Sequence, residues 1–224
     1  MSFVRIPIRF AGTLLGESRH VCAFFASPEE EYGVLLPFIR EGLARGERAY
    51  HVVDPSLRNE HLARLSGSGI DVEHVQREGQ LEVHAPADTY LRGGKFEKEA
   101  MLVLVQSVLL EGLVKSAPLT RLIAHAECVS SDPADRSDWI EYEARLNYVL
   151  SRFDDPVICA YDLRLVDASL AFDILRTHPV VYLAGALHEN PFYVRPEELV
   201  PQLLRERSGS NGRSNGRSNG RRHA

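Results

Sequence analysis

The chain has 224 residues, of which 44% are hydrophobic, and a formal net charge of −5 at pH 7. Its apolar runs fall short of the roughly 20 residues that a membrane span requires, and its N-terminus lacks the small-residue cleavage site of a secretory signal. Three cysteines without a CxxC spacing argue against a disulfide framework and favour a reducing cytoplasm.

The first predicted strand covers residues 20–26 and turns into a helix that stops at Gly46. A mononucleotide-binding α/β domain begins in this way, but its phosphate loop needs several glycines and a lysine followed by Ser or Thr. This turn instead has a capping box of Ser27 and Glu30, and glutamates at 29–31 occupy the positive end of the helix dipole. The sequence therefore argues against an ATPase. Hydrolysis through a non-standard loop is the remaining enzymatic alternative.

The alternation of strands and helices continues along the chain. Further strands are predicted at about 49–54, 81–85, 119–129, 156–163 and 180–185, and helices at about 57–65, 97–115, 139–152 and 167–176, with a last short helix after residue 196. Such an alternation predicts the α/β class, with a mostly parallel central sheet and helices on both faces.

The C-terminal segment differs in composition from the rest of the chain. Residues 208–224 contain three copies of SNGR and no acidic residue. Such a tail cannot bury apolar surface, so we expect it to be disordered; contact with RNA, a membrane surface or an acidic partner is the alternative to a solubilising role. We predict an N-terminal extension over 1–17, one folded domain over 18–207 and this tail. The acidic folded part argues against nucleic acid as a partner.

Ligands of an open parallel sheet lie at the carboxyl ends of its strands. The residues at the predicted ends are Asp54, His84, Glu127, Tyr161 and Asp162. Carboxylates and a histidine can together hold a divalent cation or a polar ligand if their strands are adjacent. The simpler alternative is that each residue caps the loop that follows it, and strand adjacency decides between the two.

Two pairs of residues share a strand face because side chains alternate along a strand: His20 with Cys22, and Cys159 with Tyr161. Imidazole and thiolate can bind a soft metal, but buried cysteine is common simply as a small hydrophobic residue. No pair has the spacing of a zinc motif and no Ser or Cys lies on a glycine-flanked elbow, so we predict no metal, no cofactor and no enzyme. His125, with apolar neighbours, is interpreted as a hydrogen-bonded core histidine.

Polar residues also accompany the later helices. Glu143 and Asn147 are one turn apart beside the predicted core stripe of their helix, where they either line a pocket or face solvent. His178 lies at the end of a helix that Pro179 stops, and Asn190 opens a turn.

Seven segments, taken in order, resemble the MEDS domain (methanogen/methylotroph, DcmR-type sensory domain) over about residues 18–204. They read HVCAFF, PFIREGLARGERAYHVVD, YLRGGKF, EYEARLN, ICAYD, LRTHP and ENPFYVRPEEL. The resemblance implies a single RecA/KaiC-like domain with a degenerate phosphate loop, and a cytoplasmic prokaryotic sensor of small hydrocarbon derivatives. It also implies an association with kinase, ATPase or DNA-binding output domains.

The resemblance further implies which residues contact the ligand. These candidates, together with Glu127 from the strand ends, are His20, Cys22, Tyr90, Glu127, Glu143, Asn147, Cys159, Tyr161, Asp162, His178 and Asn190. His51, His84 and His125 match no pattern of that family.

We therefore predict a non-enzymatic sensory domain that binds a small ligand and acts on a separate output protein, because the chain has neither a helix-turn-helix nor a kinase segment. That output protein is expected to be a kinase, an anti-sigma ATPase or a transcription regulator. The alternative is an interaction protein without a ligand, acting as an adaptor or a homo-oligomer in an anti-sigma or histidine kinase system.

Overall fold

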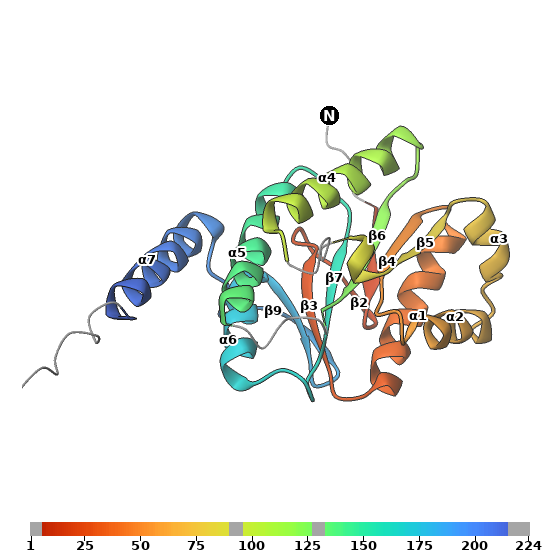
Figure 1. Ribbon diagram of the computed structural model, residues 1–224. Helices are drawn as coiled ribbons and strands as arrows, with labels where there is room; N and C mark the ends of the chain where they lie inside the picture. Colours follow the sequence, from red (N-terminus) through yellow and green to blue (C-terminus); the bar gives the residue numbers. More distant parts are fainter. Residues whose placement is uncertain (1–5, 90–95, 127–132, 215–224) are drawn as a thin grey trace, which may run out of the picture.

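The computed structural model describes residues 6–89, 96–126 and 133–214, and it places helices on both sides of a central sheet (Figure 1). The seven strands of this sheet in the described residues lie in the order β5-β4-β6-β7-β3-β8-β9. Their bounds are β3 (His20–Phe25), β4 (Arg48–Val52), β5 (Leu81–His84), β6 (Thr120–His125), β7 (Val157–Asp162), β8 (Val180–Leu183) and β9 (Ala186–Glu189).

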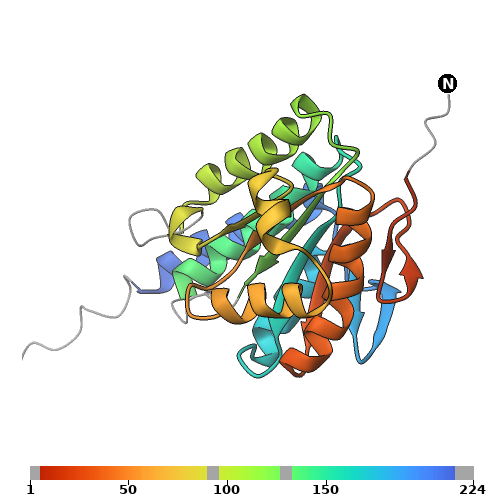
Figure 2. The same ribbon diagram turned by 90° about the vertical axis from the view of Figure 1, so that its right-hand side faces the viewer.

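The helices form two layers, one on each face of the sheet (Figures 1 and 2). One core joins the sheet to α1 (Pro28–Ala44), α2 (Arg58–Gly67) and α3 (Val72–Arg77). The other core joins it to α4 (Lys98–Val114), α5 (Pro133–Leu150), α6 (Ala168–Thr177) and α7 (Pro196–Ser214). A short 3-10 turn, η1 (Pro86–Asp88), follows β5.

All neighbouring strands from β5 to β8 pair in parallel, so the predicted α/β class with a mostly parallel sheet is confirmed. The central strands β3 and β7 pair with Cys22 opposite Cys159. Every residue of β3 and β6 is buried, as expected for strands that helices cover on both faces. The register between β3 and β7 fixes the geometry of one of the sites described below.

The sheet ends in a hairpin that the sequence did not predict. The strand expected at 180–185 stops at Leu183, and β9 returns antiparallel to it. Ala184 and Gly185 turn the chain with φ of 51° and 81°, which is the pair of positive φ angles that a tight two-residue hairpin turn needs.

A second hairpin, β1 (Arg9–Phe10) with β2 (Thr13–Leu14), lies within the predicted N-terminal extension. Phe10 is buried, and its ring meets that of Phe38 on α1 edge-on at 5.4 Å between centroids. The hairpin lies beside α1 at the edge of the molecule in Figure 2 and extends the core on that face.

Helix α7 continues to Ser214, so it includes residues 208–214 that the composition assigns to the tail. Helix α5 begins at Pro133, six residues before its predicted start, and the short helix α3 was not predicted. No helix among the described residues is long and apolar enough to cross a membrane.

Candidate functional site

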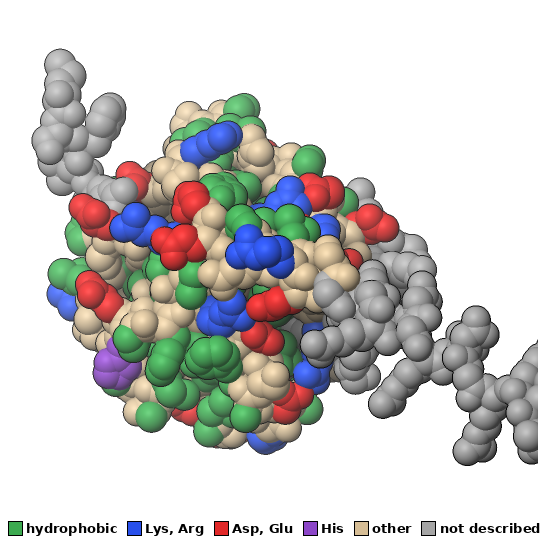
Figure 3. Space-filling model, turned by 90° about the vertical axis from the view of Figure 1, so that its left-hand side faces the viewer, with side chains coloured by type: hydrophobic (Ala, Val, Ile, Leu, Met, Phe, Trp, Pro, Cys, Tyr) green, Lys and Arg blue, Asp and Glu red, His purple; other side chains and the backbone are tan. Residues whose placement is uncertain are grey.

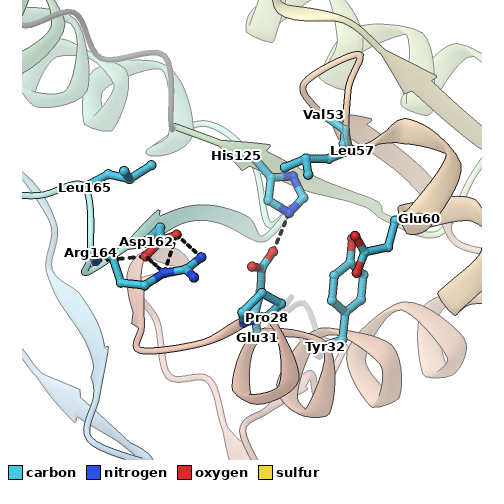
Figure 4. Close-up of a pocket in the computed structure, with 10 residues that line it drawn as sticks. All are labelled: Pro28, Glu31, Tyr32, Val53, Leu57, Glu60, His125, Asp162, Arg164 and Leu165. Carbon is cyan, nitrogen blue, oxygen red and sulfur yellow. Dashed lines mark hydrogen bonds and ion pairs between the residues drawn. The ribbon is translucent and has the colours of Figure 1, made fainter.

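A pocket of about 460 Å³ lies at the carboxyl ends of the central strands (Figure 4). We call it the carboxyl-edge pocket. Helix α1 contributes residues from its first turns, and the ends of β6 and β7, the loops after β4 and β7 and the first turn of α2 complete the wall. The lining residues are Pro28, Glu31, Tyr32, Val53, Leu57, Glu60, His125, Asp162, Arg164 and Leu165.

The N-terminus of α1, where a phosphate would bind in a nucleotide-binding domain, is capped by the chain itself. The Ser27 hydroxyl accepts a hydrogen bond from the amide of Glu30 at 3.2 Å. The Glu30 carboxylate reaches back and accepts from the amide of Ala26 at 2.8 Å, and it also accepts from the Tyr182 hydroxyl. Ser27 therefore caps the helix as predicted, while Glu30 reaches one residue beyond the N-cap amide of a standard capping box, and both side chains use amides near the site where an anion would bind.

His125 and Glu31 form the most polar part of the wall and face each other in Figure 4. The Nδ1 atom of His125 lies 3.1 Å from the carbonyl oxygen of Val52, and Nε2 lies 2.6 Å from Oε1 of Glu31. A carbonyl and a carboxylate both accept, so the ring donates at both nitrogens and pairs with Glu31 as an ion pair. The prediction of a hydrogen-bonded, buried His125 is correct, but the residue also lines a pocket.

Two buried histidines lie behind Tyr32 in the pocket wall. The Tyr32 hydroxyl is 2.9 Å from Nδ1 of His61, whose Nε2 is 3.0 Å from Nδ1 of His51. Burial, and then the neighbouring His125 and Arg58, lower the pKa of His61 to about 3. Burial also lowers the pKa of His51 well below its usual value, so both rings are neutral near pH 7.

The opposite rim belongs to the loop after β7. Asp162 pairs with Arg164, whose Nε lies 2.9 Å from Oδ1, and hydrogen bonds from Arg164 lower the pKa of Asp162. Leu165 follows and is 62% exposed. Of the strand-end residues that the sequence singled out and the structure describes, Asp162 is the one that lines this pocket. Asp54 bonds instead to Ser56, and the ring of His84 stacks on that of Tyr50.

A second group of polar side chains lies between the sheet and α5. His20, Glu143, Cys159 and His178 are all buried, and each offers one ligand atom within 4.8 Å of the others. We call this group the His–Cys–Glu cluster. It draws on β3, α5, β7 and the junction of α6 with β8, and the parallel register of β3 with β7 brings the first and third of these residues to the same face.

The carboxylate of Glu143 is the centre of the cluster. Its Oε2 lies 3.3 Å from Nε2 of His20, 3.4 Å from Nε2 of His178 and 3.7 Å from Sγ of Cys159. Its Oε1 accepts a hydrogen bond from the Tyr161 hydroxyl at 3.0 Å. Burial alone would raise the pKa of Glu143, but the neighbouring His178, His20 and Tyr161 lower it.

Burial sets the ionisation of the other members. It lowers the pKa of His178 to about 3, and it raises the pKa of the Cys159 thiol well above its usual value, as the nearby Glu143 carboxylate does too. Burial also raises the pKa of Tyr161. The Cys159 thiol, the Tyr161 hydroxyl and the His178 ring are therefore neutral near pH 7, beside the Glu143 carboxylate.

Most residues that the sequence named lie in or around the His–Cys–Glu cluster. Asn147 bonds to His20, and Asn190 donates to the carbonyl of His178 and holds that junction. Cys22 faces the same way but donates to the carbonyl of Val180 at 3.6 Å, outside the group of four. Tyr90 and Glu127 lie outside the described residues.

Sequence reasoning missed the polar wall of the carboxyl-edge pocket. Glu31 was interpreted only as an acid at a helix end, and His125 only as a core residue. Their pairing depends on α1 lying beside the end of β6, two segments 94 residues apart. The sequence carried little signal for His125, because the strand predicted at 119–129 placed it inside the strand, whereas β6 ends at this residue.

Comparison with known proteins extends these observations. A family model described as MEthanogen/methylotroph, DcmR Sensory domain (MEDS) matches residues 19–179. The chain is similar to the transcriptional repressor DcmR of Methylorubrum extorquens (strain DSM 6343 / CIP 106787 / DM4), with 25% identity over 173 residues. That match covers 77% of this chain and 62% of the repressor, so it spans less than two thirds of the relative's length.

The fold is similar to that of a KaiC-like protein from the hyperthermophilic archaeon Pyrococcus horikoshii OT3. The TM-score is 0.50 at 16% identity, and the match covers 74% of this chain and 70% of the other. The likeness concerns the fold alone, and it agrees with the KaiC-like architecture expected from the sequence.

Proposed function

Because the chain belongs to the MEDS family of sensory domains, we propose that it is a non-enzymatic module that binds a small molecule and passes the change to a separate output protein. The observation that carries this proposal is the carboxyl-edge pocket, whose volume of about 460 Å³ suits a small ligand. It lies where open parallel sheets bind their ligands.

The wall chemistry favours a molecule with an apolar body and one polar group. Pro28, Val53, Leu57 and Leu165 supply apolar surface, while the His125–Glu31 ion pair offers a polar anchor. A phosphate is disfavoured because the chain's own side chains cap the helix end that would bind it. A small hydrocarbon derivative with a hydroxyl, carbonyl or similar group fits these requirements.

A ligand in this pocket contacts segments that lead to different helices. Leu165 precedes α6, and Leu57 precedes α2. A ligand shifts the equilibrium between two arrangements only by its differential affinity for them. We propose that drawing these loops together moves α6, which packs on α5 and α7, and that a partner reads that layer of helices.

The output is proposed to be regulatory and cytoplasmic. The relative that the chain matches is a transcriptional repressor, and that match leaves more than a third of the repressor uncovered. A kinase, an anti-sigma ATPase or a transcription regulator is therefore the proposed partner. Direct nucleic-acid binding is not part of the proposal, since acidic and basic side chains intermingle on the face in Figure 3.

One observation favours the alternative of an interaction module without a ligand. The outer side of α4 exposes apolar side chains at Val103, Leu110, Leu113 and Val114, the last of them 83% exposed. Exposed apolar surface of this kind is typical of contact with another protein. If this alternative holds, Leu113→Glu alters assembly or partner binding while the pocket variants leave both unchanged.

The test is a thermal-shift screen of the full chain with short alcohols, aldehydes, ketones and halogenated alkanes. A ligand that binds the folded state raises the Tm in a concentration-dependent way. Leu165→Trp, which fills the pocket, should abolish the shift. Leu163→Trp is the matched control, because Leu163 lies two residues earlier in the same loop and does not line the pocket. The absence of any shift, or a shift that survives Leu165→Trp, contradicts the proposal.

A further inference from the structure

We propose that His20, Glu143, Cys159 and His178 bind a divalent transition metal, best Zn²⁺, between the sheet and α5. The sequence led us to expect no metal, because the four residues come from distant segments without a spaced motif. The folded chain brings their ligand atoms within 4.8 Å of one another. The inference is independent of the proposed ligand, because these residues do not line the carboxyl-edge pocket.

The ring of His178 directs a lone pair into the cluster. Its Nδ1 lies 3.0 Å from the carbonyl oxygen of Ile174, and a carbonyl can only accept, so Nδ1 carries the ring proton. Its Nε2 makes no hydrogen bond within the described residues, although it is completely buried and 3.4 Å from the Glu143 carboxylate. Two electron-rich atoms therefore face each other in a site without solvent.

The ring of His20 is oriented in the same way. Nδ1 lies 3.1 Å from Oδ1 of Asn147. The amide of Asn147 is fixed, because its Nδ2 donates to the carbonyl of Thr177 at 2.8 Å, so Oδ1 accepts from His20. Its Nε2 lies 3.3 Å from the same oxygen of Glu143, where loss of the ring proton would free a lone pair for a metal. Histidines that bind metals almost always donate their second nitrogen to a fixed oxygen in this way.

Hydrogen bonds also fix the orientation of the Glu143 carboxylate. Oε1 of Glu143 accepts from the Tyr161 hydroxyl, which in turn accepts from Nε1 of Trp139 at 3.2 Å. This leaves Oε2 to point at Nε2 of His20, at Nε2 of His178 and at the sulfur of Cys159. A cation between these four atoms would bond to all of them.

Four of the six separations between the ligand atoms agree with tetrahedral coordination, and the two from Nε2 of His178 to His20 and Cys159 lie within 4.8 Å. Ligands about 2.0–2.3 Å from a tetrahedral Zn²⁺ are roughly 3.3–3.7 Å from one another. The observed separations are 3.3 and 3.4 Å from the carboxylate to the two imidazoles, 3.6 Å from Sγ of Cys159 to Nε2 of His20, and 3.7 Å from that sulfur to the carboxylate.

The ligand set also suits the metal and its charge. A thiolate and two imidazoles exclude Mg²⁺ and Ca²⁺ in favour of zinc and its neighbours. A thiolate, a carboxylate and two neutral imidazoles carry two negative charges, which a divalent ion neutralises; Cys159 releases one proton to solvent as its bond to the metal forms. Four protein ligands without an open position indicate a structural or sensing centre that joins α5 to the sheet and to the end of α6.

The experiment measures metal in the untagged full chain with Cys128 replaced by serine, so that Cys22 and Cys159 are the remaining thiols. Elemental analysis gives zinc per chain, and titration of chelator-treated protein with Co²⁺ gives affinity and spectrum. We expect one ion per chain, with the thiolate-to-cobalt absorption of a tetrahedral site. Cys159→Ala and Glu143→Gln should weaken binding by more than about 100-fold, and Tyr161→Phe, which frees the carboxylate, by about 10–100-fold.

Cys22→Ala is the matched control: the residue is equally buried and pairs with Cys159 across β3 and β7, yet its thiol bonds to a backbone carbonyl. It should keep the metal and the cobalt spectrum. The nearly isosteric Glu143→Gln keeps the test decisive if Cys159→Ala does not fold. The proposal is overturned if the Cys128→Ser chain takes up neither zinc nor cobalt at one ion per chain. It is also overturned if a folded Cys159→Ala or Glu143→Gln variant binds the metal as tightly as that chain does.

Discussion

The carboxyl-edge pocket and the His–Cys–Glu cluster use the same two central strands in opposite ways. The pocket takes its polar groups from the ends of strands and the loops beyond them, as with Asp162 at the end of β7 and Arg164 after it, and its rim is open to water. The cluster takes His20 and Cys159 from buried strand positions and closes over them with α5. A polar group at the open rim of the pocket costs little folding free energy. A polar group buried in the cluster costs much more unless it has a hydrogen-bond partner. The pocket can therefore vary its chemistry, whereas the cluster must keep all of its members.

The stability of the two regions should differ most when the Glu143 carboxylate at the centre of the cluster is removed. Glu143→Ala leaves the Tyr161 hydroxyl and the Cys159 thiol without their acceptor and opens a cavity in a site that water does not reach. Each buried donor left without an acceptor costs about 1–3 kcal/mol, so the unfolding free energy should fall by about 2–5 kcal/mol. The measurement is the urea midpoint at pH 7, compared with wild type purified in the same way.

Glu60→Ala is the counterpart in the pocket. The Glu60 carboxylate pairs with Arg64 one turn along α2 and is 51% exposed. Its loss should change the unfolding free energy by no more than about 0.5 kcal/mol. Similar urea midpoints for Glu143→Ala and Glu60→Ala would contradict the proposed difference between the cluster and the pocket.

The ionisation of His61, which lies behind Tyr32 in the pocket wall, makes the stability of this region depend on pH. The folded-state pKa of His61 is lowered to about 3, while an unfolded histidine titrates near about 6.5. The unfolded chain therefore binds more protons between these values, and the contribution of His61 to stability is present above about 6.5 and is lost as the pH falls. Between pH 7 and pH 5 this loss amounts to about 2 kcal/mol.

Asp155 opposes this effect, because burial raises its pKa to about 6 and its contribution falls as the pH rises through the same window. The prediction is therefore a difference: lowering the pH from 7 to 5 should cost wild type about 2 kcal/mol more than it costs His61→Gln. Urea unfolding at both pH values measures it. His74→Gln, at an exposed histidine, should match wild type, and an equal pH dependence in His61→Gln would contradict the prediction.

Sequence reasoning anticipated the sheet and much of the cluster for different reasons. Continuous apolar runs predicted the buried strands, because a parallel strand that helices cover on both faces carries apolar residues at nearly every position. The cluster residues came mainly from the family resemblance; for Glu143 the helix pattern left pocket and solvent equally open. The structure buries it completely, because α5 packs against the sheet and against α4, α6 and α7 at once. Which strands are adjacent is a property of the whole chain, so the meeting of Glu31 with His125 could not be predicted locally.

The smallest effect on stability, and the most specific one, should come from the pocket rim. Arg164 is 61% exposed and pairs with Asp162, whose side chain is 14% exposed. Arg164→Ala should therefore change the unfolding free energy by less than about 0.5 kcal/mol, as should Arg136→Ala, whose exposed pair with Asp167 lies outside the pocket. The two variants should differ in ligand response, because only Arg164→Ala leaves an unpaired carboxylate facing the pocket. Its thermal shift with neutral ligands should shrink and that with small amines should grow, since an open site can change its charge without a cost in folding.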